Sequence, residues 1–323
     1  MQPPHSADVL LRPVLTFMSE QRPSPPILRI TLCVITRRRP AELQRLLGSL
    51  ERLRGPAGTA LSLLVVENDE AGSEGATTRA LATSRLPTRH VFEPRVGIPF
   101  ARNRCLDEAA AASDYLVFLD DDETVDPALV ERLLATARAT DAAIVTGPAL
   151  PAFPPDAPAW AARSGAYDPP RYATGAPRPF AYTNNVLFAA ELVRDGAARF
   201  DESMRYTGGS DKEFFARLAR AGHRIVWADD AVTFEWYPRE RLTRRWLFQR
   251  ALRLGTVARR TDGAPRARML LDALRFAARA AWRAGGRPLD PSSATALAAW
   301  DIGRAVGLVL GAAGIRYYEY KSR

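Results

Sequence analysis

Three apolar segments of the chain each end in a run of charged residues. Four consecutive acids, Asp120-Asp121-Asp122-Glu123, follow the apolar segment 115–119. Glu67-Asn68-Asp69-Glu70 follows segment 61–66, and Thr36-Arg37-Arg38-Arg39 follows segment 30–35. Carboxylate oxygens suit Mg²⁺ or Mn²⁺, which proteins usually bind through one or two carboxylates together with substrate phosphates. We therefore expect a divalent-cation site after segment 115–119, although acids before Pro127 would also favour the start of a helix.

Two further segments carry residue types suited to phosphate binding and proton transfer. Gly97 to Asn103 stands where a helix begins, so its free amides and Arg102 could face a phosphate. Thr207-Gly208-Gly209-Ser210-Asp211 precedes another helix. The paired glycines would let a substrate approach the backbone, and Asp211 could act as a base. Each segment alone is also compatible with an ordinary helix entry or an aspartate cap.

Strands and helices alternate along the first two thirds of the chain, and this pattern determines where those residues meet. Apolar strand segments at 30–35, 61–66, 90–92, 115–119 and 142–146 alternate with helical periodicity. Such alternation predicts an α/β fold with a mostly parallel sheet covered by helices on both faces. Ligands of such sheets bind beyond the carboxyl ends of the strands, where the charged runs stand.

The chain of 323 residues divides into three regions by composition. Residues 1–26 contain six prolines and read as a tail without regular structure. Residues 27–238 form the expected catalytic domain, in which the proline-rich segment 151–180 is a long loop or lid rather than a helix. Residues 239–323 are helical and basic. Two cysteines exclude a disulfide framework.

Together these segments resemble family-2 nucleotide-sugar glycosyltransferases of the GT-A fold, in particular the bacterial succinoglycan-type exopolysaccharide transferases. The resemblance runs from about residue 30 to residue 255. Single motifs are weak, but the ordered set is specific. In chain order these motifs are Arg38-Arg39-Pro40, Val65-Val66-Glu67-Asn68-Asp69, Ala101-Arg102-Asn103, Phe118-Leu119-Asp120-Asp121-Asp122-Glu123, Asn184-Asn185 and Gly208-Gly209-Ser210-Asp211.

The resemblance implies a role for each matching residue. Asp211 corresponds to the catalytic base, and the metal, Mn²⁺ or Mg²⁺, would be held at Asp120 and Asp122. The acceptor would contact Gly208, Gly209 and Trp236. Residues implied in binding the nucleotide sugar are Thr36, Arg38, Glu67, Arg102, Asp120, Asp121, Arg250 and Arg253.

The implied reaction is an inverting transfer from a nucleotide-sugar donor, with a UDP-hexose favoured, to a saccharide or polyprenyl-linked saccharide acceptor. Two positions depart from the family pattern: Glu67 replaces the usual aspartate, and Ser210 replaces the glutamate that usually precedes the base. The Gln-x-x-Arg-Trp box of processive enzymes is not matched by 249–253, which favours addition of a single sugar.

The basic excess lies in the last quarter of the chain. Residues 239–323 hold 18 basic and 6 acidic side chains, whereas residues 1–238 have a net charge of −3. Arg268, Arg275 and Arg279 alternate with apolar residues at helical spacing, which predicts a basic amphipathic helix. We expect peripheral contact with an anionic membrane on the cytoplasmic side. The alternative is that this helix and the uncharged segment 305–315 pack on the catalytic domain. No run of about 20 apolar residues predicts a spanning helix.

Three other functions are compatible with parts of the sequence. An arginine-rich nucleic-acid-binding protein would explain the basicity, but the acidic strand ends argue against nucleic acid as a partner. A protein that binds a sugar nucleotide without turnover is suggested by Ser210. A sugar-nucleotide pyrophosphorylase would need a glycine-rich loop after the first strand, and Thr36-Arg37-Arg38-Arg39-Pro40 contains no glycine.

Overall fold

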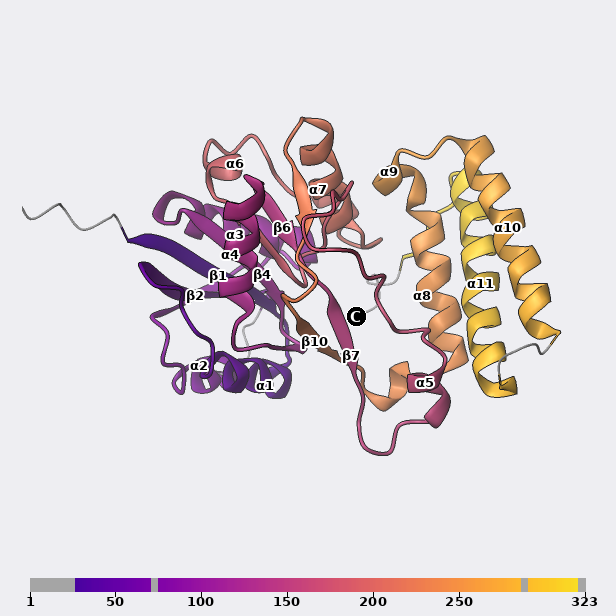
Figure 1. Cartoon of the computed structure of the whole chain (residues 1–323), viewed down its shortest axis with the longest axis horizontal. Helices are drawn as coiled ribbons and strands as arrows, with labels where there is room; N and C mark the ends of the chain where they lie inside the picture. The colour runs from indigo at the N-terminus through magenta and orange to yellow at the C-terminus, as the bar shows by residue number, and fades with distance from the viewer. Residues whose placement is uncertain (1–26, 71–74, 286–289, 319–323) are drawn as a thin grey trace, which may run out of the picture.

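The structure, a computed structural model, describes residues 27–70, 75–285 and 290–318. The predicted tail 1–26 lies outside these described residues. The described chain forms an α/β domain followed by a layer of helices (Figure 1).

The α/β domain is built on a seven-stranded sheet of order β3-β2-β1-β4-β8-β6-β9. Pairing is parallel from β3 through β4, and β8 runs antiparallel between β4 and β6. The mostly parallel sheet predicted from the alternation is therefore confirmed, with β8 as the return strand. The strands are β1 (Leu28–Thr36), β2 (Thr59–Glu67), β3 (Thr88–Phe92), β4 (Tyr115–Asp120), β6 (Ile144–Thr146), β8 (Val186–Ala189) and β9 (Ile225–Trp227).

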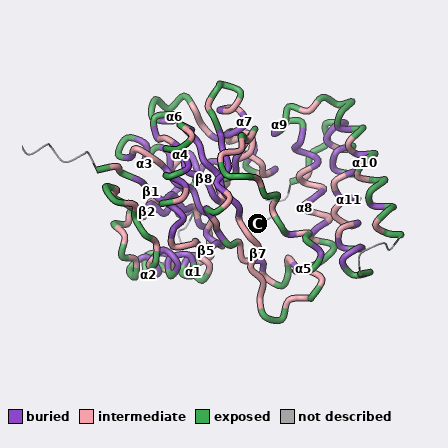
Figure 2. Tube along the Cα trace, in the orientation of Figure 1, coloured by how far each residue is buried: buried purple, intermediate pink, exposed green. Residues whose placement is uncertain are grey.

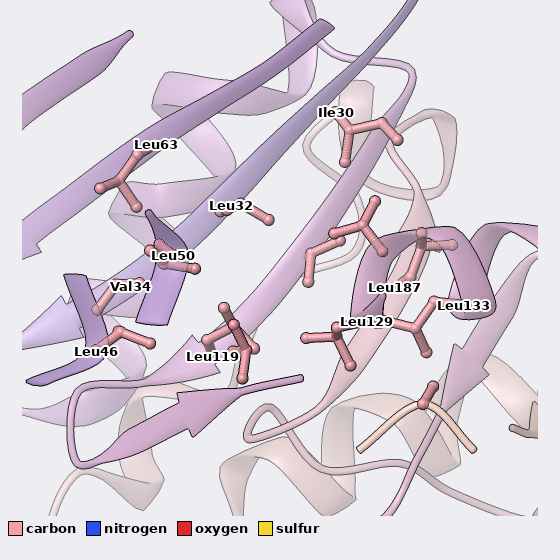
Figure 3. Packing of buried hydrophobic residues seen from close by; sticks show 14 of the residues in the cluster. Ile30, Leu32, Val34, Leu46, Leu50, Leu63, Leu119, Leu129, Leu133 and Leu187 are labelled. Atoms are coloured by element: carbon pink, nitrogen blue, oxygen red, sulfur yellow. The ribbon is translucent and has the colours of Figure 1, made fainter. Parts of the chain in front are cut away.

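Helices cover both faces of this sheet, as the continuous apolar strands require. One core gathers leucines of β1, β2 and β4 under the apolar sides of α1 and α4 (Figure 3). The opposite core is aromatic, with Phe118, Phe188, Phe200, Phe214 and Phe215 fully buried. The helices of this domain are α1 (Pro40–Leu50), α2 (Ala76–Leu81), α3 (Ile98–Ala109), α4 (Leu129–Thr140), α5 (Ala159–Arg163), α6 (Glu191–Arg194) and α7 (Ser210–Arg220), with 3₁₀ turns at Ala110–Ala112 and Glu202–Met204.

A second, three-stranded sheet extends from the carboxyl end of β4. It has the order β5-β10-β7, formed by β5 (Glu123–Val125), β10 (Thr233–Trp236) and β7 (Ala149–Ala152). Only Asp121 and Asp122 separate the end of β4 from the start of β5, so the four acids span the turn between the two sheets. This turn is why consecutive acidic side chains point to different partners.

The segment 151–180 is not wholly a loop, because α5 forms within it. Its aromatic side chains join the domain to the C-terminal helices. Tyr167 packs edge-on against Tyr237 at 4.9 Å and stacks on Trp246 at 5.9 Å between ring centroids. The Tyr167 hydroxyl donates a hydrogen bond to the Arg241 carbonyl oxygen at 2.9 Å. The predicted lid is therefore a packed connection, which sequence periodicity alone misses.

The helical layer consists of α8 (Arg244–Thr256), α9 (Ala258–Asp262), α10 (Arg266–Ala284) and α11 (Pro291–Ala312), preceded by the 3₁₀ turn Arg239–Arg241. α11 lies between α8 and α10, and α10 is at the outer edge (Figure 1). Glycines allow α8 and α11 to touch through their backbones: a Cβ on Gly307 would lie 2.2 Å from the Leu252 carbonyl oxygen.

α11 is long and apolar enough to cross a membrane by length and composition, although half of its most apolar stretch is buried within the protein. The lack of a run of about 20 apolar residues predicts no spanning helix, so the sequence pattern misses this candidate. The physical reason is that small residues and two charges, Asp301 and Arg304, dilute the apolar pattern in the sequence without interrupting the helix.

Candidate active site

The acids that follow β4 have different partners. Asp121 is buried, accepts a hydrogen bond from Thr36 Oγ1 at 2.8 Å and faces Arg39 at 3.2 Å. Glu123 is also buried and accepts hydrogen bonds from Thr233 Oγ1 and from the Asp120 backbone N–H, both at 3.2 Å. Asp121 and Glu123 therefore serve the turn itself, which leaves Asp120 and Asp122 as the carboxylates available for a ligand.

Asp122 is held by two arginines from distant parts of the chain. Its Oδ2 lies 3.3 Å from Arg39 Nη1, at the end of β1, and 3.3 Å from Arg241 Nη1, in the C-terminal region. Its backbone oxygen accepts a hydrogen bond from the Trp236 N–H at 3.0 Å. Neither arginine is predicted from the sequence as a partner of Asp122, although Arg39 stands in the basic run after segment 30–35.

The concentration of carboxylates makes ionisation difficult at the end of β4. Burial raises the pKa of Asp120 to about 7, an effect that Arg102 opposes and that Asp122 and Asp211 reinforce. Burial likewise raises the pKa of Asp121 to about 6, against the favourable charge of Arg39. A further positive charge at this position would favour the ionised carboxylates.

Arg102 connects the carboxylates of β4 with those of α7. It stands in the first turns of α3 and is almost completely buried. Its Nη1 donates a hydrogen bond to Ser210 Oγ at 3.1 Å, and its Nη2 lies 3.8 Å from Asp211 Oδ2. Because Ser210 is neutral, the guanidinium charge remains directed to Asp120 and Asp211. These contacts of Arg102 are thus with α7, and its role toward the donor stays a prediction.

Asp211 stands in the first turn of α7, which begins at Ser210 after two glycines. Gly208 and Gly209 have φ of 70° and 82°, in the left-handed region that side chains disfavour. A Cβ on Gly209 would also lie 3.1 Å from Thr261 Cγ2 of α9. The glycines thus turn the chain so that α7 starts close to α9 and Asp211 stays partly exposed.

The ends of β1 and β2 hold the predicted nucleotide-side residues. Arg38 has a φ of 54° and pairs through Nη2 with Asp69 Oδ1 at 3.0 Å. Glu67 is 1% exposed, and its Oε2 lies 3.0 Å from His90 Nε2. Its Oε1 is buried without a hydrogen-bond partner. Glu67 therefore keeps one carboxylate oxygen unpartnered but closed to solvent, while His90, expected to be structural, contacts the other.

The C-terminal region supplies part of the same site. Arg250, on α8, lies with its Nη1 3.8 Å from Glu235 Oε1, and Arg241 approaches that oxygen at the same distance. Arg253 is partly buried about one turn further along α8. Trp236, the predicted acceptor residue, lies under Arg45 with 5.3 Å between the guanidinium carbon and the ring centroid.

The carboxylates at the end of β4 suit a divalent cation that also binds the substrate. Asp120 and Asp122 offer the hard oxygen atoms that such a cation prefers, and burial raises the pKa of Asp120 although Arg102 opposes the shift. Among residues 27–70, 75–285 and 290–318, no group of three or more His, Cys, Asp or Glu side chains is arranged to hold a metal ion. A cation here would take its remaining ligands from water and from the substrate.

Comparison with known proteins decides the family. The model of the family described as "Glycosyl transferase family 2" matches residues 31–199. This stretch includes most of β1, all of β4, the acids that follow β4, and Arg102. The chain belongs to glycosyl transferase family 2. It is 37% identical over 231 residues to the succinoglycan biosynthesis protein ExoM of Rhizobium meliloti strain 1021, covering 71% of this chain and 73% of ExoM. It is 31% identical over 200 residues to ExoA of the same strain, covering 60% and 59% of the two chains.

Solved structures show the same fold for this family-2 glycosyltransferase. TarS residues 1–349 of S. aureus match with a TM-score of 0.53 at 14% identity, covering 90% of this chain and 93% of that one. TarS has also been solved with UDP-GlcNAc. The mannosyltransferase PcManGT of Pyrobaculum calidifontis, solved with GDP-Man and Mn²⁺, has a TM-score of 0.53 at 19% identity, covering 88% and 75% of the two chains. The expected GT-A fold is confirmed.

Proposed function

We propose that this glycosyltransferase transfers a single sugar from a nucleoside diphosphate sugar, with a UDP-hexose favoured, to a saccharide or lipid-linked saccharide acceptor in exopolysaccharide assembly. The likeness to ExoM and ExoA supports the exopolysaccharide role. The complex of TarS with UDP-GlcNAc supports a nucleotide-sugar donor.

The observation that carries the proposal is that one buried arginine, Arg102, acts on carboxylates of two elements. Its charge opposes the raised pKa of Asp120 at the end of β4, and its Nη2 lies 3.8 Å from Asp211 Oδ2 at the start of α7. A donor diphosphate near Asp120 and an acceptor hydroxyl near Asp211 would then both approach this buried cation. Arg102 would offset the negative charge that develops on the diphosphate.

The reaction in this proposal is one displacement at the anomeric carbon. Asp211 takes the proton of the acceptor hydroxyl while the acceptor oxygen forms its bond to that carbon. The bond from the carbon to the diphosphate oxygen breaks, and the nucleoside diphosphate leaves. Since attack and departure occur on opposite faces, the anomeric configuration inverts and no enzyme nucleophile is needed.

A divalent cation, Mn²⁺ or Mg²⁺, would be held by Asp120 and Asp122 and would supply electrostatic stabilisation of the leaving diphosphate. The chain's own contribution is to keep these carboxylates in position. Arg39 and Arg241 hold Asp122, and the charge of Arg102 opposes the raised pKa of Asp120. The unpartnered Oε1 of Glu67 is buried, so it would accept a hydrogen bond from a nucleotide base once the side chains covering it move aside.

Thermal stability with a panel of nucleotides tests the donor site. A ligand present at about 100 times its dissociation constant adds about 2.7 kcal/mol to the stability of the folded state. We expect one nucleoside diphosphate to raise the melting temperature in the presence of Mn²⁺ and not in its absence. The Asp122→Asn variant should lose this metal-dependent shift. No shift with any nucleotide would contradict the proposal.

An assay of sugar transfer separates this function from binding without turnover. Ser210, which replaces the glutamate usual in the family, suggests the alternative that the protein binds a sugar nucleotide but has lost the ability to transfer the sugar. A nucleotide-dependent melting shift combined with no release of nucleoside diphosphate, in the presence of saccharide acceptors, would favour that alternative. Release that depends on an acceptor would support the transferase.

A further inference from the structure

The exposed apolar side chains of the molecule are concentrated on its outermost helices. Of the 13 large apolar residues exposed in the described part of the chain, nine lie between residues 270 and 318. Only Met269, Ala273 and Ala280 of the 19 residues of α10 are buried. α10 therefore packs on α11 along a narrow strip and leaves most of its circumference uncovered, as the exposed positions along it in Figure 2 show.

Seven of these nine side chains lie on α10 and α11 and make up a surface that we call the apolar face. α10 contributes Leu270, Leu271, Leu274 and Trp282, which are 47%, 50%, 69% and 61% exposed. α11 contributes Ile302, Val306 and Val309 across a shallow groove. The groove has a volume of about 430 Å³ next to Leu270 and Leu274, and a neighbouring hollow of about 360 Å³ continues it along Ala277, Ala281 and Ile302.

A stripe of arginines runs along the edge of the apolar face. At about 100° per residue, Arg268, Arg275 and Arg279 lie within about 40° of one another on α10. Leu271 and Trp282 lie next to this stripe on the same helix. Arg268 and Arg275 share a single acid, Asp272, at 3.7 and 2.8 Å, so the stripe keeps an excess of positive charge.

We propose that the apolar face and its arginine stripe bind the surface of an anionic lipid bilayer. Leucines and a tryptophan on one side of a helix, with arginines beside them, are the composition of helices that lie in the membrane interface. Anionic headgroups attract the arginines, whose long side chains can reach them while Leu274 and Trp282 enter the acyl boundary. This inference concerns the helical layer and holds whatever donor the active site uses.

Charge favours a membrane over a second copy of the chain. In a twofold dimer with antiparallel α10 helices the two arginine stripes would lie along the same border, which is repulsive. Internal contacts favour a helix pair that lies on the bilayer over one that spans it. Asp301 is fully buried, with its Oδ2 2.6 Å from Arg283 Nη1 and its Oδ1 paired with Arg279. Gly303 and Gly307 press on the α8 backbone, so α11 cannot leave α8 without losing these contacts.

Flotation with vesicles tests the proposal on the full-length protein. We expect the protein to float with vesicles of phosphatidylcholine and phosphatidylglycerol and to float weakly with phosphatidylcholine alone. The double variant Leu274→Glu, Trp282→Glu should remain at the bottom of the gradient. Its matched control is Ile27→Glu, which changes an apolar side chain that is 64% exposed on the catalytic domain and should float as the wild type does.

The arginine stripe is tested separately. Arg268→Gln with Arg275→Gln should weaken binding to the anionic vesicles about 30-fold, because one arginine near the surface contributes about 5-fold. The matched control, Arg138→Gln with Arg220→Gln, removes two exposed arginines of the catalytic domain and should bind normally. Both double variants change only exposed side chains, and an unchanged circular-dichroism melt establishes that each is folded.

Quenching by brominated lipid gives a position-specific test. The anionic vesicles should quench tryptophan fluorescence of the wild type, and Trp282→Phe, which keeps an apolar ring, should remove that quenching. Three results would overturn the proposal. They are wild-type protein that does not float, a Leu274→Glu, Trp282→Glu variant that floats fully, and a dimer in sedimentation that this variant dissociates, which would make a second copy the occupant.

Discussion

Arginines perform opposite tasks in the two halves of this molecule. In the catalytic domain Arg39 and Arg102 are directed inward, and they offset carboxylates that burial makes difficult to ionise. On α10, Arg268 and Arg275 are directed to solvent, with side chains 73% and 68% exposed. The same residue type therefore offsets buried carboxylates in one region and provides a charged outer surface in the other.

The two regions also differ in what their apolar residues cover. In the sheet domain, leucines and phenylalanines are buried on both faces of the strands. In the helical layer, leucines of α10 stay exposed and glycines, rather than large side chains, form the contact between α8 and α11. The helical layer therefore exposes apolar side chains of the kind that the sheet domain buries.

The largest expected effect lies in the catalytic half. Asp211→Asn should lower the rate of sugar transfer by about 10²–10⁴-fold, because the acceptor hydroxyl loses its general base. The donor should still produce its full thermal shift. Asp195→Asn, an exposed acid on the same domain, serves as the control. Normal turnover of Asp211→Asn would exclude Asp211 as the base.

The second-largest effect concerns the free energy of unfolding, for which a buried acid and an exposed acid of the helical layer should differ. Asp301→Ala should lower the free energy of unfolding by about 3–5 kcal/mol, since Arg279 and Arg283 lose their buried partner. Asp272→Ala, which removes a surface pair with Arg275, should cost about 0–1 kcal/mol. Denaturant titration of both variants measures the difference, and equal values would show that Asp301 does not hold α10 on α11.

Glycine substitutions distinguish the contact between α8 and α11 from ordinary helix propensity. Gly307→Ala should lower the free energy of unfolding by about 1–3 kcal/mol, because its Cβ would overlap the Leu252 carbonyl. Gly48→Ala, in α1, has nothing within 4 Å of the added Cβ and should stabilise the protein by about 0.5–1 kcal/mol. Changes of the same sign in thermal melts would contradict the packing argument.

The smallest effect concerns the departure from the family pattern at position 210. Ser210→Glu should lower kcat/KM about 10-fold, or about 1.4 kcal/mol, because a carboxylate at Ser210 Oγ would draw the Arg102 charge away from the diphosphate. Ser210→Ala keeps the site neutral and should change kcat/KM less. Steady-state kinetics of the two variants decides this, and an active Ser210→Glu enzyme would show that Arg102 tolerates the additional acid.

The mostly parallel sheet could be predicted from the sequence, and the site only in outline. Continuous apolar strands ending in charged residues predict such a sheet with the charged runs after segments 30–35, 61–66 and 115–119 at one edge, and the family resemblance implies Asp211 as the base. The pairing of Asp122 with Arg241 could not be predicted, since 119 positions separate these residues and their contact depends on how the helical layer meets the domain. The different partners of the four adjacent acids could not be predicted either, because they follow from the turn into β5.

By itself the sequence determined which residues could perform chemistry and where the positive charge would gather, because residue types and local periodicity are properties of the chain. Tertiary structure decided which of those residues have partners. It turned Asp121 toward Thr36, directed Arg102 to Asp211, and left the apolar side of α10 exposed. These outcomes depend on contacts between distant segments, and their free energies are set by burial in the folded protein.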